Sequence, residues 1–327
     1  MQPLFQPSHL AKLCKEYDLT PSKRYGQNFL IDEKPIEDMI RAAELSKDDV
    51  VVEIGPGFGT LTFAVAPRVK RVIAFEIERK LEPYWKEKLE TGPTSSTDSV
   101  SGHRRNWSDA KYGLRTEASE KLETREKDKR DQKIKRSKDS GEIEIIWGNA
   151  LKHVSRITYH VSNGYKVVAN LPYQITSKVL QTLLADVENK PERIVVMVQK
   201  EVAERIVAAP PDMSVLAVSV QYYGEPSIVA YVPRESFWPE PDVDSAIITI
   251  ALKHLSTSAQ DDEKIFFRVV RAGFANKRKQ VWRNLSVGLG LPADVVKGVL
   301  KDVAGNEKAR AQELSVDQWR SVVNRFF

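Results

Sequence analysis

The chain has 327 residues, 41% of them hydrophobic, which is enough for one large and one small globular domain. Its apolar runs fall well short of the ~20 residues that span a bilayer, and its N-terminus has no apolar core typical of a signal peptide. The one cysteine, Cys14, excludes a disulfide framework, and the five histidines show no metal-ligand spacing. We therefore expect a cytoplasmic protein without a metal, and the net charge of +5 does not exclude an acidic partner.

From residue 35 to 200, short β-rich runs alternate with stretches of helical periodicity. A helical face is predicted at Ile36, Met39, Ile40 and Ala43. Strands are predicted at residues 50–54, 71–77, 143–147, 166–170 and 193–199, and later ones at 227–232 and 245–252. The alternation predicts an α/β fold, in which a parallel sheet is covered by helices on both faces.

Residues 91–141 interrupt this alternation. The segment is first rich in Ser, Thr and Gly and then densely charged, with 13 Lys/Arg and nine Asp/Glu in all. Neither part can bury enough apolar surface to offset the entropy lost on ordering. We therefore predict an insertion that is disordered or partly a frayed helix. A tolerated surface insertion is favoured over an RNA-binding arm.

The strands stop at about residue 263, and a small α-helical C-terminal domain is predicted. Residues 266–285 and 315–327 have helical periodicity, with a turn-rich segment at 288–294 between them, and Trp282 and Trp319 are expected in the core. Residues 264–327 hold 13 Lys/Arg against five Asp/Glu, which indicates a polyanion partner, the alternative being a solvated helical surface. The predicted RNA-docking residues fall within about two helical turns: Lys277, Arg278, Lys279 and Arg283.

A glycine-rich loop follows the first predicted strand, with the sequence Glu53-Ile-Gly55-Pro-Gly57-Phe-Gly59. Glycines allow a tight turn and the close approach of a ligand that a Cβ would exclude, although such a loop can also serve strand-to-helix packing alone. Glu76 ends the next strand, where an acidic residue can accept hydrogen bonds from a ribose. Together these residues predict a nucleoside-cofactor site.

A second constellation, Asn170-Leu171-Pro172-Tyr173, ends the strand at residues 166–170. The exocyclic amine of adenine is a poor nucleophile because its lone pair is delocalised into the ring. The Asn170 amide oxygen and the Leu171 carbonyl can accept both amine hydrogens and expose that lone pair. Pro172 stiffens the turn, and Tyr173 offers a face on which a flipped base can stack. A plain strand-ending turn is the alternative, but the position after a cofactor loop favours a catalytic role.

Six segments, in this order, resemble signatures of the small-subunit ribosomal RNA adenine dimethyltransferase family: residues 23–32, 53–62, 170–177, 199–206, 237–246 and 274–285. The resemblance covers nearly everything except the insertion. It implies a Rossmann-like domain dependent on S-adenosyl-L-methionine at residues 23–255, after an N-terminal extension at 1–22. A helical RNA-docking domain at 256–327 would follow. The expected partner is small-subunit rRNA in the maturing subunit, where a monomeric enzyme would dimethylate two adjacent adenines near the 3′ end.

The resemblance also implies roles for residues at matching positions. Asn28 and Leu30 would cover the cofactor, and Gly55, in the loop that includes Gly57, would lie against its amino-acid portion. Glu76 would hold its ribose hydroxyls, and Asn170 would lie between cofactor and target.

Two other parts of the site follow from the same resemblance. Tyr173 and Phe237 would wall the base pocket. The family usually has Asp after the strand at 143–147, contacting the adenine amine of the cofactor, whereas this chain has Asn149. Because Asn keeps an acceptor oxygen but loses the charge, we expect weaker cofactor binding rather than none.

Three alternatives differ in substrate or in class. A relative that dimethylates large-subunit RNA shares this architecture, but Leu171 and the segment at 274–279 favour the small-subunit branch. Adenine methyltransferases acting on DNA tend to carry Asp or Ser before Pro-Pro. A non-catalytic RNA-binding assembly or transcription factor is disfavoured by the intact tetrapeptide at 170–173.

Overall fold

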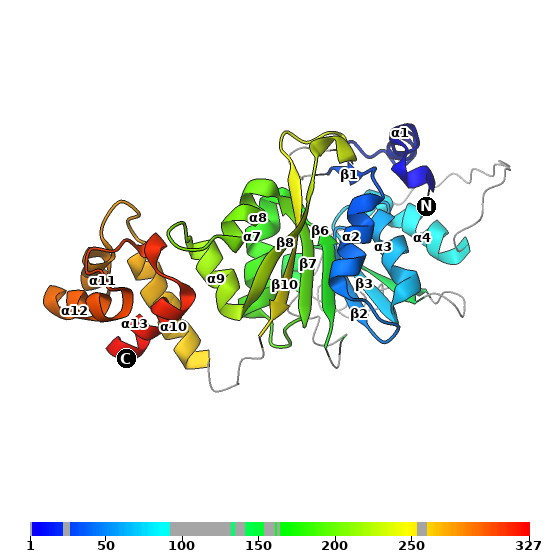
Figure 1. Cartoon of the computed structure of the whole chain (residues 1–327). Helices are drawn as coiled ribbons and strands as arrows, with labels where there is room; N and C mark the ends of the chain where they lie inside the picture. The colour runs from blue at the N-terminus through cyan, green and yellow to red at the C-terminus, as the bar shows by residue number, and fades with distance from the viewer. Residues whose placement is uncertain are drawn as a thin grey trace, which may run out of the picture.

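A computed structural model of the chain describes residues 2–21, 27–91, 132–134, 141–153, 161, 164–253 and 260–327. An eight-stranded sheet with the order β4-β5-β3-β2-β6-β7-β10-β8 forms its centre (Figure 1). The strands are β2 (Val50–Ile54), β3 (Arg71–Glu76), β4 (Gln132–Ile134), β5 (Glu142–Trp147), β6 (Lys166–Asn170), β7 (Arg193–Gln199), β8 (Gly224–Val232) and β10 (Ser245–Leu252). A second, two-stranded sheet pairs β1 (Phe29–Leu30) with β9 (Phe237–Trp238).

The five central strands, β5-β3-β2-β6-β7, are parallel, as the sequence predicts. The two later strands make the sheet mixed: β10, whose direction was not predicted, runs antiparallel to both β7 and β8. The reason is the link between β8 and β10, which holds only the short 3₁₀ turn η8 (Arg234–Ser236) and β9. Without a crossover helix, β10 returns beside β8 in the opposite direction.

Helices cover both faces of the sheet (Figure 1). One face carries α2 (Lys34–Ala43), α3 (Thr60–Val65) and α4 (Glu82–Thr91), with α1 (Pro7–Glu16) beyond them, and the other carries α7 (Thr176–Gln181), α8 (Lys200–Val207) and α9 (Val215–Tyr223). Shorter helical segments are η1 (Gln2–Phe5), η3 (Ala66–Arg68), η4 (Arg79–Leu81), α6 (Ala150–His153), η6 (Tyr173–Ile175) and η7 (Thr182–Asp186). Among the described residues, none forms a helix long and apolar enough to cross a membrane.

Each central strand contributes to two hydrophobic cores, one on each face. In β7, Ile194, Val196 and Val198 pack in the core on the side of α7–α9, while Val195 and Met197 pack on the side of α1–α4. Burial on both faces explains why these strands read as continuous apolar runs.

Helix α2 buries a slightly different face from the predicted one. Ile36, Met39 and Ala43 are buried, but Ile40 is only half-buried. Asp38 is buried instead, because Lys34 and Arg41 pair with its carboxylate.

The predicted insertion at residues 91–141 is partly ordered. Gln132–Ile134 form β4, which pairs antiparallel with Ile143–Ile145 of β5. The prediction of a segment without regular structure is therefore wrong at these three residues, because the exposed edge of β5 can accept a further strand. Residues 92–131 and 135–140, where the rest of that prediction falls, lie outside the described residues.

The C-terminal residues form a group of helices beside α9 (Figure 1). They are α10 (Gln260–Gly273), α11 (Val281–Leu289), α12 (Ala293–Ala304) and α13 (Val316–Phe326), with the turn η10 (Ala311–Glu313). Trp319 is fully buried, as expected, and Trp282 is half-buried. Helix α12 was not predicted from the sequence, and the helix predicted across residues 266–285 is interrupted at 274–280.

The break between α10 and α11 has a structural cause. The buried Asn284 side chain donates hydrogen bonds to the carbonyl oxygens of Gly273, at 2.6 Å, and Asn276, at 3.0 Å. A Cβ on Gly273 would lie 2.3 Å from the Trp319 ring, so only glycine fits at the end of α10. These contacts hold residues 274–280 as a turn.

Candidate active site

A cavity of about 430 Å³ opens at the carboxyl edge of the central strands. Parallel strands end at one edge of a sheet, and residues that follow β2, β3, β5 and β6 therefore meet there. All seven residues predicted to contact the cofactor line this cavity: Asn28, Leu30, Gly55, Gly57, Glu76, Asn149 and Asn170.

The glycine loop between β2 and α3 forms the base of the cavity. Gly55, Gly57 and Gly59 have φ angles of +73°, +55° and +84°, which side-chain-bearing residues rarely adopt. Helix α4 holds this loop: the Trp85 indole donates to the Gly57 carbonyl at 2.9 Å, and the Tyr84 hydroxyl donates to the Phe58 carbonyl at 2.7 Å. The loop backbone is therefore fixed in place beside the cavity.

Glu76 is buried at the end of β3, and both of its carboxylate oxygens are held by the backbone. The Gly57 amide donates to Oε2 at 3.0 Å and the Glu78 amide to Oε1 at 2.7 Å. Burial raises the pKa of Glu76, and these backbone amides oppose the rise. The Ile77 amide is a third backbone donor to this carboxylate, which has about four acceptor positions, so Glu76 can still accept a hydrogen bond from a ligand hydroxyl.

Glu53, which the sequence analysis did not assign a contact, also lines the cavity and is only 2% exposed. The Thr62 hydroxyl donates to its Oε2 at 2.6 Å. Burial raises the pKa of Glu53 to about 8, against the effect of the Thr62 hydrogen bond and with a smaller contribution from Glu76. Glu78 is the third carboxylate, and the described lining residues include no Lys, Arg or His. The cavity is therefore suited to a ligand that carries positive charge and hydroxyl donors.

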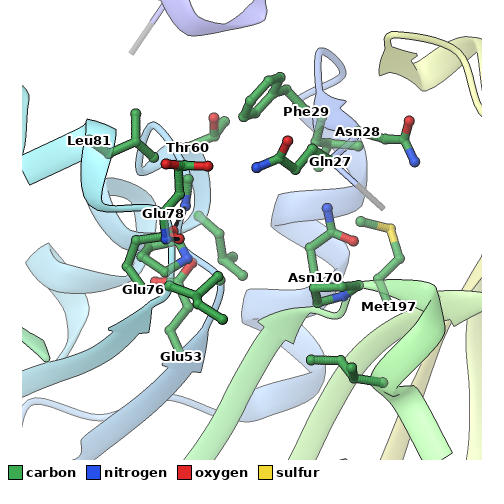
Figure 2. Close-up of a pocket in the computed structure, with 18 of the residues that line it drawn as sticks. Gln27, Asn28, Phe29, Glu53, Thr60, Glu76, Glu78, Leu81, Asn170 and Met197 are labelled. Atoms are coloured by element: carbon green, nitrogen blue, oxygen red, sulfur yellow. Dashed lines mark hydrogen bonds between the residues drawn. The ribbon is translucent and has the colours of Figure 1, made fainter. Parts of the chain in front are cut away.

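Residues 27–30 lie across the cavity from the acidic residues (Figure 2). Their position is fixed by the small sheet, in which Phe29 pairs with Trp238 and Leu30 with Phe237. The Ser236 hydroxyl adds a hydrogen bond to Asp32 at 3.0 Å. The Phe29 ring also approaches the loop and would lie 3.3 Å from a Cβ on Gly57. These contacts join the N-terminal segment to residues some 200 positions later in the chain.

Asn149 lines the cavity from the turn after β5, with an exposed side chain. Its amide oxygen accepts a hydrogen bond from the Leu151 backbone at 2.9 Å, at the start of α6. This hydrogen bond fixes the direction of the amide oxygen, which keeps one lone pair for a ligand.

The tetrapeptide at residues 170–173 follows β6. The Asn170 side chain points into the cavity beside Met197 (Figure 2). Pro172 also lines it, whereas the Leu171 side chain is 1% exposed and packs in the core, so that only the Leu171 backbone can meet a ligand. The Leu171 amide donates to the Met197 carbonyl at 3.1 Å, which ties the tetrapeptide to β7.

A second cavity, of about 270 Å³, adjoins the first. It is lined by Asn28, Tyr173, Gln174, Gln199, Pro241, Asp242 and Val243, and both Asn28 and Gln174 line the first cavity as well. Tyr173 thus belongs to the second cavity, while Asn170 and Pro172 belong to the first. Burial raises the pKa of Tyr173, so its hydroxyl is protonated at neutral pH.

Phe237 reaches neither cavity, in contrast to the prediction that it walls the base pocket. It is 3% exposed and packs in the core, because β9 pairs with β1 and places Phe237 opposite Leu30. Its neighbour Trp238 stacks on Phe29, with ring centroids 6.4 Å apart.

The predicted docking residues lie together but not on one helix. Lys277, Arg278 and Lys279 occupy the turn between α10 and α11, and Arg283 lies in the first turn of α11. The prediction of a helical arrangement is therefore wrong, because α10 ends at Gly273.

A further cation, Lys297 on α12, lies beside these residues. Its ammonium is 4.3 Å from the centroid of the Trp282 ring, and the Arg283 guanidinium is 5.1 Å from it. No carboxylate of the described residues pairs with Lys297 or Arg283. Lys297 was not predicted as a docking residue because its place beside Arg283 depends on helix α12, which was not predicted from the sequence.

Within the parts of the chain that the structure describes, no group of three or more His, Cys, Asp or Glu could hold a metal ion. A glycine loop, an acidic residue after the second central strand and a shared carboxyl edge are typical of α/β enzymes that bind a nucleoside cofactor.

Comparison with known proteins identifies the family. The profile of the ribosomal RNA adenine dimethylase family matches residues 19–327, and the chain belongs to that family. It is 34% identical over 319 residues to ribosomal RNA small subunit methyltransferase A of Dehalococcoides mccartyi, covering 97% of this chain and 93% of the relative. It is 33% identical over 334 residues to the protein of the same name from Bacillus cereus, covering 99% and 97%.

Two solved structures confirm the Rossmann-like methyltransferase fold. A dimethyladenosine transferase from Plasmodium falciparum superposes with a TM-score of 0.65 at 22% identity, covering 91% of this chain and 96% of that one. The 23S rRNA methyltransferase ErmE gives a TM-score of 0.61, also at 22% identity, covering 91% and 99%. At this identity the two structures bear on the fold alone.

Proposed function

We propose that the protein transfers methyl groups from S-adenosyl-L-methionine to the exocyclic amines of two adjacent adenines near the 3′ end of small-subunit rRNA. One observation carries this proposal: the tetrapeptide 170–173 contributes Asn170 and Pro172 to the acidic cavity and Tyr173 to the adjoining one. A cofactor in the first cavity and a base in the second would therefore meet at Asn170.

The residues of the first cavity fit S-adenosyl-L-methionine. This cofactor has a ribose with two hydroxyl donors and a net positive charge, and the cavity offers Glu76 for the former and Glu76 with Glu78 for the latter. Glu53, whose pKa is about 8, keeps its proton at neutral pH and does not add to this charge. The backbone of Gly55 and Gly57 can lie against it without a side chain between. When bound, the cofactor supplies an electrophilic methyl group on its sulfonium.

The chain's own residues orient and expose the amine that receives this methyl group. We assign the Asn170 amide oxygen and the Leu171 carbonyl as acceptors for the two amine hydrogens. Pro172 has no N–H to compete for these acceptors. With the cofactor bound, these two acceptors would leave the lone pair of the amine facing the methyl group, and the proton that the amine gives up would pass to water.

The second methylation needs the same contacts with one hydrogen fewer. A monomethylated amine has a single N–H, so only one of the two acceptors can hold it. We assign Tyr173 as the stacking surface that keeps the base in place for this step, because stacking does not depend on the number of amine hydrogens.

The substrate would dock on the C-terminal cations. Lys277, Arg278, Lys279 and Arg283 can neutralise phosphates, and Lys297 extends the same surface onto α12. None of them lines the cofactor cavity, so docking and methyl transfer would use different residues.

Methylation of large-subunit RNA is the alternative reaction on this fold. The curated relatives at 33–34% identity over nearly the whole chain carry the small-subunit name. We therefore place the protein on the small-subunit side.

The proposal is tested by incubating the purified protein with labelled cofactor and, separately, immature small and large ribosomal subunits. We expect dimethyladenosine in the small-subunit RNA alone. Label in the large-subunit RNA would contradict the choice of substrate, and cofactor binding without any label would favour a non-catalytic factor.

A further inference from the structure

We infer that Ser245 is a positioning residue for methyl transfer, whose hydroxyl holds the Tyr173 ring in the orientation on which the target base stacks. The inference rests on the proposed function, because it concerns the base that enters the second cavity. Neither the family resemblance nor the comparisons assign a role to this serine.

Ser245 is a rigid anchor. It is fully buried at the start of β10, and its backbone lies between Gln199 of β7 and Val232 of β8 in the sheet register. Tyr173 lies instead in the 3₁₀ turn η6, outside the sheet. Its hydroxyl is 2.8 Å from Ser245 Oγ, and this hydrogen bond connects the tetrapeptide to the strand.

The anchor belongs to the segment that forms another part of the second cavity. Pro241, Asp242 and Val243 line that cavity immediately before β10 begins. The segment is itself held, because the Lys200 amide donates to the Asp244 carbonyl at 3.0 Å and the Arg234 amide donates to its carboxylate at 3.2 Å. The hydrogen bond to Ser245 therefore fixes Tyr173 relative to other residues around the base.

Stacking makes the ring orientation important. An aromatic side chain can rotate about two bonds, and only a narrow range of ring planes lies parallel to a base held by Asn170. The hydroxyl lies on the axis of the second rotation, so a hydrogen bond there fixes chiefly the first rotation, and with it the position of the ring beside the base. Tyr173 is half-buried, so water can replace Ser245 as its hydrogen-bond partner, and loss of the tether should affect orientation more than folding.

The test is a double-mutant cycle with Ser245→Ala, Tyr173→Phe and the combination. Each single change removes the same hydrogen bond, and we expect each to lower kcat roughly fivefold, the size expected for one hydrogen bond. The double variant should be no slower than the slower single variant. The cofactor dissociation constant should not change, because neither residue lines the first cavity.

Thr249→Val is the matched control. It removes a hydroxyl from the same strand, and Thr249 Oγ1 is buried without a hydrogen-bond partner among the described residues. We expect its kcat to equal that of the wild type. KM for RNA is measured separately. We expect the Ser245 and Tyr173 variants to lose activity through a lower kcat and not a higher KM, because the base is oriented after the RNA binds.

Several outcomes would overturn the inference. Losses that multiply in the double variant would mean that the two residues act independently. A Ser245→Ala protein that melts at a lower temperature but keeps its full kcat would show a merely structural serine. An inactive wild type would contradict the proposed function as well, whereas an active wild type with a multiplicative cycle would contradict this inference alone.

Discussion

The cofactor cavity and the C-terminal helices carry opposite charge in opposite settings. At the sheet edge, Glu53 and Glu76 are buried and Glu78 lies beside them, with no Lys, Arg or His in the described lining. On α11 and α12, Arg283 is exposed and Lys297 half-buried, and neither is paired with a carboxylate of the described residues.

The difference explains how one chain can bind two ligands of opposite charge at two different sites. Buried carboxylates interact strongly with a small cation because the surrounding dielectric is low, whereas exposed cations act together on a polyanion and are screened by salt. Ligand affinity at the first kind of site should depend on pH and on single residues. Affinity at the second kind should depend on ionic strength and on the number of charged residues.

The largest effect is expected from a substitution at Asn170, which tests whether methyl transfer takes place at the carboxyl edge of the central strands. Asn170→Ala should lower turnover at least about 100-fold, because it removes an interaction made to the reacting amine. Cofactor affinity should fall much less. Single-turnover methylation and a cofactor titration measure the two quantities, with the exposed Asn324→Ala as control. Near-wild-type dimethylation would contradict the proposed role of Asn170.

Glu76→Ala should mainly weaken cofactor binding, by roughly tenfold or more, because a hydrogen bond to a charged group is lost and a buried site is opened. Calorimetry of cofactor binding measures the change, with Glu90→Ala on the exposed side of α4 as control. An unchanged dissociation constant would remove Glu76 from the cofactor site.

The C-terminal cations should contribute smaller, additive effects on RNA binding. Replacing Lys277, Arg278, Lys279 and Arg283 with Gln should flatten the salt dependence of RNA affinity by roughly one unit of slope per lost contact. Lys297→Gln should add a further step of similar size, and cofactor affinity should be unaffected.

The matched control for this series replaces four exposed lysines outside the C-terminal helices: Lys12, Lys15, Lys47 and Lys86. If both sets of substitutions change the salt slope equally, RNA binding follows net charge and not the C-terminal surface.

The last prediction concerns stability and its dependence on pH, and not catalysis or binding. Burial raises the pKa of Glu53 from an ordinary value of 4.5 to about 8, so between these values the folded protein keeps a proton that the unfolded chain releases. The stability from this group is present below pH 4.5 and is lost as pH rises through about 8. Glu53→Gln, which cannot ionise, should therefore gain melting temperature relative to wild type as pH rises from 6 to 9. A constant difference across that range would mean that Glu53 titrates normally.

Much of the site could be predicted from the sequence because its residues lie at the end of a predicted strand or directly after one. Residues just after parallel strands meet at one edge, so Gly55, Glu76 and Asn170 could be brought together without coordinates. Phe237 could not be placed in this way, because its burial depends on a pairing with Leu30 that joins distant parts of the chain.

The fold was predictable for similar reasons. The central strands are apolar on both faces and stand out in the sequence, whereas the direction of β10 depends on the link that precedes it. In the C-terminal region, periodicity continues across Gly273, and the break there depends on contacts from Asn284 and Trp319 that local sequence does not reveal.

The central claim is tested most directly by mapping methylated adenines in rRNA from cells that lack this gene. We expect two adjacent adenines near the 3′ end of the small-subunit rRNA to be unmethylated, and mass spectrometry to show their dimethylation restored by the wild-type gene but not by Asn170→Ala. Full dimethylation in the cells that lack the gene, or restoration by the Asn170 variant, would contradict the account.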